Sequence, residues 1–569
     1  MDATPRPSET AAPAGQGSDH VIHIDKRARM EILFAILLGL FLSALDQTIV
    51  GTALPRVVTD LQGNQLYTWV VTIYLLTSTI TGPIYGKLSD QFGRKLLLMV
   101  GISLFLLGSF LSGLSQTMEQ LIIFRGLQGL GAGALFPISL AVIGDLFSPQ
   151  ERGKYQGLFG AVFGISALIG PALGGYLTDQ ISWHWVFFVN LPVGAVALFI
   201  IWRLMPAHTE SGVTRRVDYL GVSMFTLALV PILVGLTNKQ TADWTDPWVG
   251  GLIGLGLIVG LVFLWVESRA AEPILPLDLF RNRSYSVSLL AAFLASFGFF
   301  GAIIFLPRWY QVVHGSTATE SGYQLLPLLA GLIISSVISG QIVSRTGRYK
   351  WLTVGALFVV GIGLLLMTQL RSDTDPAALW VWQFIAGVGI GPTMAVFTII
   401  VQNSVPWQKL GVATSNLTLF RQVGGTVGLA LAGTIFGSTL QTQAPLEVTK
   451  SLTAAGAPPQ LLSAIASGQA LQGAFSLDDI SGVGNMGARI LASIPAQYQA
   501  FVQPYITNIV QAIHVAFSEA IVSTIWLSAA AAFIAALATL ALHEVPLRRT
   551  VSENSMAARR PTTEVAATE

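Results

Sequence analysis

The chain has 569 residues, of which 52% are hydrophobic and 11% charged, with a formal net charge of +1. A soluble domain carries roughly 25% charged residues, so this composition excludes a water-soluble globular protein and indicates a surface that faces lipid. The absence of cysteine excludes disulfides, thiol catalysis and Cys-ligated metals. The 7 His are scattered and predict no metal site, and the near-neutral charge predicts no nucleic-acid binding.

Long apolar segments recur along the whole chain. A membrane-spanning helix needs about 20 mostly apolar residues, and by that rule we predict fourteen helices. In chain order they are 32–54, 67–86, 95–114, 120–143, 156–178, 184–205, 217–237, 248–267, 285–311, 322–343, 351–369, 378–401, 412–437 and 519–542. The composition of residues 1–28 and 547–569 predicts disordered cytoplasmic tails. The sequence therefore predicts an all-α integral membrane protein.

Basic residues are unequally distributed over the predicted loops. With the N-terminus placed in the cytoplasm, twenty Lys and Arg fall inside and five outside. Because cytoplasmic loops are enriched in Lys and Arg, both termini are predicted to be cytoplasmic. The segment 438–518 lacks an apolar run of spanning length and falls outside, so we predict a partly helical extracytoplasmic insertion.

An internal repeat divides the chain. The segment Gly86 to Lys95 is similar to Gly340 to Lys350 at an offset of 254, and Arg125 to Gly133 is similar to Gln383 to Gly391 at an offset of 258. Two matched pairs in the same order indicate two related halves, as in transporters built from repeats. The predicted units are an N-terminal six-helix half, two additional helices and a C-terminal six-helix half, at 29–210, 211–270 and 271–546.

Several of these segments resemble signatures of the major facilitator superfamily. Gly86 to Lys95 resembles the family's loop between helices 2 and 3, Arg125 to Gly133 its helix 4, and Gly164 to Gly175 the helix 5 signature of antiporters. The segments 45–55, 183–194 and 411–425 resemble the fourteen-helix drug:proton antiporter branch. The resemblance implies the major facilitator fold, with two six-helix halves and two extra central helices.

This chain departs from the branch at two of these places. Gly51 and Thr52 replace the usual Asn-Val pair, and His184 stands where an Arg is usual. Neither change affects the predicted fold, but because of both the resemblance does not identify the substrate.

Three ionisable residues are predicted to lie well inside helices. Asp46 stands in an apolar run, where a charge costs about 2.5–3.5 kcal/mol on insertion scales. Burial raises a carboxylate's pKa and a nearby cation lowers it, so such a group can load and release protons; the alternative is an Asp that only joins helices. Arg125 and Arg421 stay protonated and need a carboxylate, a carbonyl or water. The resemblance makes Asp46 the expected partner of Arg125, with carbonyls alone as the alternative, while Arg421 could serve structure only.

The 86–95 loop is predicted to act as a latch made of Gly86, Asp90, Gly93 and Arg94. The two glycines permit a tight turn. The resemblance implies that Asp90 docks on the N-terminus of the helix near Gly411, where the helix dipole favours an anion; the alternative is an ordinary charged loop.

Other small and aromatic residues are assigned no chemistry of their own. Small residues let helices approach in lipid and Pro can kink a helix, so we expect helix packing from Gly164, Gly170, Pro171 and Gly174. Possible cavity aromatics are Trp69, Tyr74, Phe159, Phe163, Trp309 and Tyr310. Asp145, Glu267 and Glu519 are expected at helix ends.

The predicted function is proton-coupled export of hydrophobic or amphipathic drugs by a monomer in a bacterial inner membrane. No catalytic residue, metal or cofactor is predicted, and no phosphate-binding loop that would indicate ATP-driven transport is visible. The rivals are export of a lipid, siderophore or self-made antibiotic, with the segment 438–518 meeting an envelope partner, and a membrane sensor or scaffold that does not transport.

Overall fold

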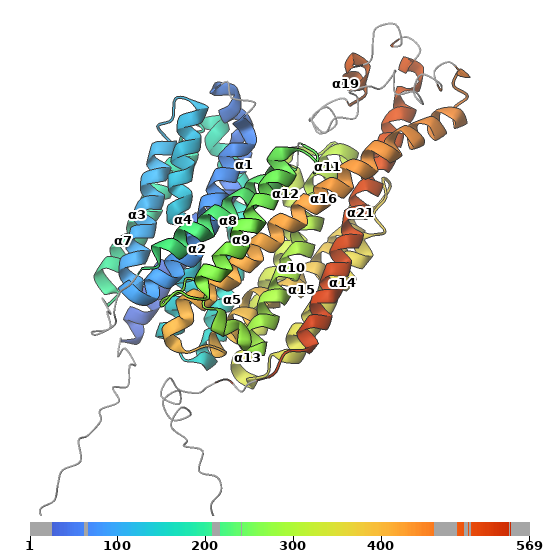
Figure 1. Cartoon of the computed structure of the whole chain (residues 1–569). Helices are drawn as coiled ribbons and strands as arrows, with labels where there is room; N and C mark the ends of the chain where they lie inside the picture. The colour runs from blue at the N-terminus through green and yellow to red at the C-terminus, as the bar shows by residue number, and fades with distance from the viewer. Residues whose placement is uncertain are drawn as a thin grey trace, which may run out of the picture.

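The computed structural model describes residues 25–61, 66–206, 217–239, 242–459, 462, 486–493, 499, 502–544 and 547. Regular structure in this part of the chain is helical (Figure 1). The N-terminal half contains α1 Lys26–Asp60, α2 Tyr67–Phe92, α3 Arg94–Ser112, α4 Met118–Leu146, α5 Pro149–Gln180, α6 Trp185–Phe188 and α7 Asn190–Leu204. The expectation of an all-α membrane protein is confirmed.

Two additional helices follow, and then the second half. The additional pair is α8 Tyr219–Asn238 and α9 Leu252–Glu267, with a π-helical turn η2 Pro247–Gly251 leading into α9. The C-terminal half contains η3 Leu277–Arg281, α10 Arg283–Ile303, α11 Leu306–His314, α12 Ala318–Tyr323, α13 Leu326–Thr346, α14 Lys350–Met367, α15 Pro376–Asn403, η4 Trp407–Lys409, α16 Leu410–Ala454, α19 Met486–Ser493, η5 Gln503–Tyr505 and α21 Ile506–Leu540.

Thirteen helical segments within the described residues are long and apolar enough to cross a membrane. The predicted second helix, 67–86, is not among them, since α2 carries Ser78 and five Thr, which lower its hydropathy. It is nevertheless 26 residues long and packs between α4 and α16. The structure is thus compatible with fourteen spans, and that count stays a prediction.

Helix packing repeats between the halves. In the first half α4 packs against α2 and α3, and α1 against α5 and α7. In the second half α15 packs against α13 and α14, and α10 against α16 and α21. The halves meet where α5 contacts α13 and α2 contacts α16, which is the reciprocal contact that a two-fold relation requires. The helices that the sequence repeat relates therefore make equivalent contacts in the two halves.

One end of the bundle carries the turn between α2 and α3, and we call it the latch end. Gly93 ends α2 with φ 94°, a conformation that residues with a Cβ rarely adopt. Its counterpart Gly347 ends α13 with φ 70°. Both turns thus have the geometry that glycine at these positions predicts.

The last two long helices extend past their expected ends at the opposite end of the bundle (Figure 1). We expected helices over 412–437 and 519–542, but α16 continues to Ala454 and α21 begins at Ile506. Their extensions pack on each other, with Val448, Leu452 and Ile509 fully buried. Glu519 consequently lies inside α21 and not at a helix end. Most of 460–501 lies outside the described residues, as do the predicted tails apart from a few residues at their inner ends, so the assignment of 438–518 to the outside stays a prediction.

The outer surface of the bundle is apolar. On α9, for example, Leu257, Ile258 and Leu261 are 58%, 64% and 70% exposed. Exposed apolar patches of this extent are unfavourable in water and match a lipid environment.

Candidate functional site

Asp46 and Arg125 form a buried ion pair between α1 and α4. Asp46 lies in the middle of α1 and is 0% exposed, while Arg125, in the first half of α4, is 1% exposed. Arg125 Nη1 donates to Asp46 Oδ2. The expected partnership is therefore present, and the alternative in which carbonyls alone satisfy Arg125 is not.

Neutral donors complete the surroundings of the Asp46 carboxylate. Its Oδ1 accepts from Gln128 Nε2 at 2.8 Å and from Asn190 Nδ2 at 3.2 Å. Asn190 Nδ2 also donates to Ser109 Oγ at 3.0 Å. Both oxygens of the Asp46 carboxylate therefore accept hydrogen bonds from side chains of the first half.

Arg125 is held from several sides as well. Nη1 also donates to Gln128 Oε1 at 2.8 Å, and Nε donates to the carbonyl oxygen of Val70 at 3.4 Å. The guanidinium carbon lies 4.2 Å from the centroid of the Tyr74 ring, in cation–π geometry. Tyr74, predicted as a cavity aromatic, thus packs on the ion pair, and its hydroxyl lies 3.2 Å from Ser43 Oγ.

Each charge of this network depends on the other, because both are buried. A buried pair becomes strongly unfavourable when one partner loses its charge or its contact, at about 3–5 kcal/mol. Protonation of Asp46 would remove the anion that Arg125 Nη1 contacts. With Asp46 fully buried, access to its carboxylate requires these helices to move.

The second half has no equivalent ion pair at the matching position. The repeat aligns Gln383 with Arg125, and Gln383, on α15, donates to Tyr310 Oη at 3.2 Å. Arg421 lies elsewhere, on α16, and is 8% exposed. Its Nη2 donates to the carbonyl oxygens of Thr393 at 2.7 Å and Met394 at 3.1 Å. Backbone carbonyls are the partners described for this guanidinium, while its Nη1 is buried with no described partner, so the role of Arg421 stays a prediction.

Asp90 contacts the start of α16, where the resemblance places it. Oδ1 accepts from the backbone N–H of Gly411 at 3.0 Å and Oδ2 from that of Val412 at 2.9 Å. Asp90 also pairs with Arg94, whose Nε donates to Asp145 Oδ2 at 3.0 Å. A carboxylate at a helix N-terminus that is also paired with Arg connects the two halves through charge-assisted bonds.

Gly86 has a different role from the one we expected. It lies inside α2, away from the turn, and a side chain there would overlap Ser415 and approach the carbonyl oxygen of Gly411. Gly86 therefore permits α16 to approach α2, and only Gly93 serves the turn.

A second contact at the latch end joins α5 to α13. Gly153 and Gly340 meet backbone to backbone, so that a Cβ on either would overlap the carbonyl oxygen of the other. Close by, Gln156 Nε2 donates to Gln402 Oε1 at 2.8 Å. The halves are thus packed directly on each other at the latch end.

The glycines of the helix 5 signature pack α5 against its neighbours, as expected. A side chain at Gly170 would overlap Thr48, one at Gly174 would overlap Thr52, and one at Gly164 would overlap Ile333 of α13. Pro171 lies inside α5. The site assignments that rest on them, like the others above, stay predictions.

The remaining aromatic candidates contact other side chains in the bundle. Phe159 and Phe163 both pack edge-on against Phe136, with ring centroids 6.0 and 5.7 Å apart from it. Trp309 is fully buried and its Nε1 donates to Ser518 Oγ at 3.0 Å. Trp69 is half-buried at the start of α2. A role for any of the six in a substrate cavity stays a prediction.

Sequence reasoning missed Gln128 and the contact made by Asn190. Gln128 follows Arg125 by three residues, which places both on one face of α4, so the spacing contained a usable signal. Asn190 starts α7, and its arrival beside Asp46 depends on tertiary packing. Local sequence gives no indication of that contact.

The comparisons with known proteins agree with this architecture. The sequence profile described as Major Facilitator Superfamily matches residues 36–429. The multidrug transporter protein MdtP of Bacillus subtilis is 40% identical over 411 residues, which are 72% of this chain and 76% of that protein. Multidrug resistance protein 3 of the same organism is 38% identical over 71% of this chain and 79% of that protein.

A solved structure shares the fold at low sequence identity. The crystal structure of the human organic anion transporter MFSD10 (TETRAN) has a TM-score of 0.53 and 15% identity, covering 72% of this chain and 94% of that one. With a profile that matches more than half of its length and relatives this similar, the chain belongs to the major facilitator superfamily.

Proposed function

We propose that this transporter exports hydrophobic or amphipathic drugs from a bacterial cell and that inward movement of protons drives the export. The relatives named multidrug transporter and multidrug resistance protein support the substrate class. The observation that carries the coupling is the fully buried Asp46, paired with Arg125 between two helices of one half.

In this mechanism Asp46 holds the transported proton or competes with substrate for it. Arg125, Gln128 and Asn190 favour the charged carboxylate, so a proton released from Asp46 leaves a stabilised site behind. Protonation removes the anion that Arg125 Nη1 contacts and weakens the contact of α1 with α4. Rocking of the two halves, with Asp90 holding the latch end closed, then alternates the side from which the site is reached.

The driving force is sufficient for useful export. One elementary charge moving through 100 mV supplies about 2.3 kcal/mol, which corresponds to a concentration ratio of about 50. We propose that the monomer performs the whole cycle without a cofactor.

Transport into proteoliposomes tests the proposal. Purified protein is reconstituted, a pH gradient is imposed, and uptake of a panel of cationic dyes, drugs and labelled lipids is followed with and without a protonophore. We expect gradient-dependent movement of dyes and drugs that the protonophore abolishes. Movement of lipid alone would replace the drug assignment, and no movement of any substrate would support a scaffold.

The topology proposal can be tested in intact cells because the chain has no cysteine. Single cysteines are placed at the exposed Thr346, at the latch end, and at the exposed Ala454, at the end of α16. An impermeant thiol reagent should label Ala454→Cys and spare Thr346→Cys until the cells are opened. The opposite pattern would invert the orientation.

Gln128→Leu should shift the pH dependence of substrate binding. The change removes a 2.8 Å hydrogen bond to the carboxylate of Asp46, and a hydrogen bond to a charged group contributes about 1.5–3 kcal/mol. Because the lost bond favours the charged carboxylate, the midpoint of pH-dependent substrate binding should move to higher pH. Binding measured against pH in wild-type and mutant protein checks this, and an unmoved or acid-shifted midpoint would contradict the role of Gln128.

A further inference from the structure

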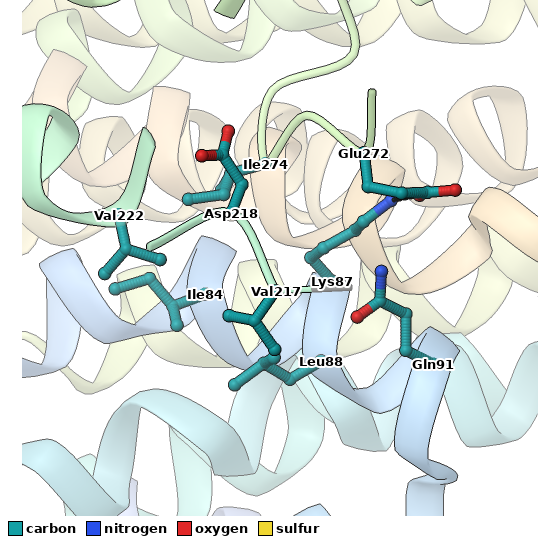
Figure 2. A pocket seen from close by; sticks show the side chains of 9 residues that line it. All are labelled: Ile84, Lys87, Leu88, Gln91, Val217, Asp218, Val222, Glu272 and Ile274. Atoms are coloured by element: carbon teal, nitrogen blue, oxygen red, sulfur yellow. Dashed lines mark hydrogen bonds and ion pairs between the residues drawn. The ribbon is translucent and has the colours of Figure 1, made fainter. Parts of the chain in front are cut away.

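The additional helix pair meets α2 at the latch end, next to a small pocket. The pocket is lined by residues of α2, of the start of α8 and of the segment that follows α9, including Lys87, Val217, Asp218 and Glu272 (Figure 2). α8 also contacts α16. The pair therefore lies against both halves, close to the Asp90 contact.

Asp218, which lines this pocket, lies close to a second carboxylate, Glu267. Asp218 caps α8, with Oδ1 accepting from the backbone N–H of Gly221 at 2.8 Å. Glu267 ends α9, is 2% exposed, and its Oε1 accepts from the backbone N–H of Leu275. In each residue the second oxygen, Asp218 Oδ2 and Glu267 Oε2, is buried and has no hydrogen-bond partner among the described residues, although the backbone N–H of Ile274 also interacts with the Glu267 carboxylate.

Gly221 locates these two oxygens relative to each other. The point where Gly221 would carry a Cβ lies 2.3 Å from Asp218 Oδ2 and 2.8 Å from Glu267 Oε2. The two oxygens are therefore no more than about 5 Å apart. Two anions at this distance, one of them almost fully buried, cannot both stay charged without compensation.

Among the described residues, the surrounding charges supply little of that compensation. Lys87 of α2 is the described cation that lines the pocket; its Nζ pairs with Glu272 at 2.6 Å, and it also interacts electrostatically with the Glu267 carboxylate. The described groups facing the pocket thus comprise one cation and three carboxylates, counting Glu267. No described cation contacts the two oxygens without partners; Arg215 and Arg216, which precede Asp218, lie outside the described residues.

We propose that Asp218 and Glu267 form a second proton-binding site, outside the central ion pair, in which the two carboxyl groups hold one proton. A proton fits this pair better than a metal ion. Ca²⁺ takes six to eight oxygen ligands and Mg²⁺ six, whereas each carboxylate here has one oxygen available. Within the described residues no group of three or more His, Cys, Asp or Glu could hold a metal.

The position of the pair gives its protonation a mechanical effect. Glu267 Oε1 holds the segment after α9 through Leu275, and Glu272 of the same segment is bound to Lys87 of α2. Loss of the shared proton would make the two carboxylates repel and separate the start of α8 from the end of α9. The attachment of the additional pair to α2 would then loosen as pH rises at the latch end.

Infrared difference spectroscopy of the full-length protein in lipid tests this inference. Exposed carboxyl groups are already charged above about pH 5, so a spectrum at about pH 6 minus one at about pH 9 isolates carboxyl groups that stay protonated near neutrality. Asp46→Asn serves as the parent protein, so that the central pair contributes nothing and the result does not depend on the proposed coupling. We expect one protonated-carboxyl band that is lost at high pH.

Variants that replace one carboxyl group by an amide show which residues give this band. Glu267→Gln and Asp218→Asn should each remove it, and either variant suffices if the other does not fold. Glu272→Gln breaks the ion pair with Lys87 and leaves the two carboxyl groups intact, so the band should remain. Titrations with Na⁺, Mg²⁺ or Ca²⁺ at constant pH should leave it unchanged. A band that survives both Glu267→Gln and Asp218→Asn, or one that a metal ion displaces at constant pH, would overturn the proposal.

Discussion

Asp46→Asn is expected to abolish proton-driven export while substrate exchange down its own gradient continues. The amide cannot gain or lose a proton, so the concentration ratio of about 50 that 100 mV supports per charge should fall to unity. The mutant keeps an oxygen that can accept from Arg125 Nη1, and Gln128, the Val70 carbonyl and the Tyr74 ring still surround the guanidinium. The measurement is gradient-driven uptake and counterflow exchange in the same proteoliposomes.

Asp60→Asn is the matched control for this experiment. Asp60 lies on the same helix and pairs with Arg56 at 3.2 Å, but both side chains are exposed. Exposed pairs contribute about 0–1 kcal/mol, so export should be unchanged. Full proton-driven export by Asp46→Asn would exclude Asp46 as the coupling residue and direct the search to Glu519, inside α21, and to Asp145.

Asp90→Asn should open the latch end of the protein. The side-chain amide can accept from only one of the two backbone N–H groups of Gly411 and Val412, and the ion pair with Arg94 is lost. Losing charge-assisted bonds of about 1.5–3 kcal/mol each and the favourable helix dipole should weaken closure by about 3 kcal/mol, or about 100-fold in the open fraction. Turnover should fall because one step of the cycle is disfavoured.

A single cysteine can report this opening. Ser336 of α13 is buried, and its Oγ donates to the carbonyl oxygen of Gly157 of α5. A thiol at this position should react only when the halves separate. Labelling of Ser336→Cys should accelerate about 100-fold with Asp90→Asn. The control is Asp278→Asn, which removes an exposed ion pair with Lys409, immediately before α16. Equal labelling rates with and without Asp90→Asn would make Asp90 an ordinary loop residue.

Much of the architecture could be predicted because the relevant signals are local. Each of these signals can be read within one segment or by comparing two similar segments. They are the apolar runs, the glycine at the α2–α3 turn and the repeat offset. The pairing of Asp46 with Arg125 was also predictable, since two opposite charges buried in one half have few other partners. Even so, the resemblance was needed to place their helices side by side.

What could not be predicted depends on contacts between distant segments. In their extra turns, α16 and α21 bury apolar side chains against each other. Hydropathy alone therefore predicted that both helices are confined to their long apolar runs. Gly86 was predicted to serve a turn because the contact of α2 with α16, which requires a glycine there, is not visible in the local sequence. The unpartnered oxygens of Asp218 and Glu267 likewise emerge only when α8 and α9 are placed together.

The length of α16 has a mechanical consequence. Its 45 residues correspond to about 68 Å of helix, more than twice the roughly 30 Å of the hydrocarbon core, and Pro445 lies inside its far part. The first turn of this helix receives Asp90, and its last turns lie beyond the opposite end of the bundle, packed on α21. A force or a torque applied to the far end is therefore borne by the same continuous backbone that carries the Asp90 contact, and α16 can transmit strain from one face of the membrane to the other.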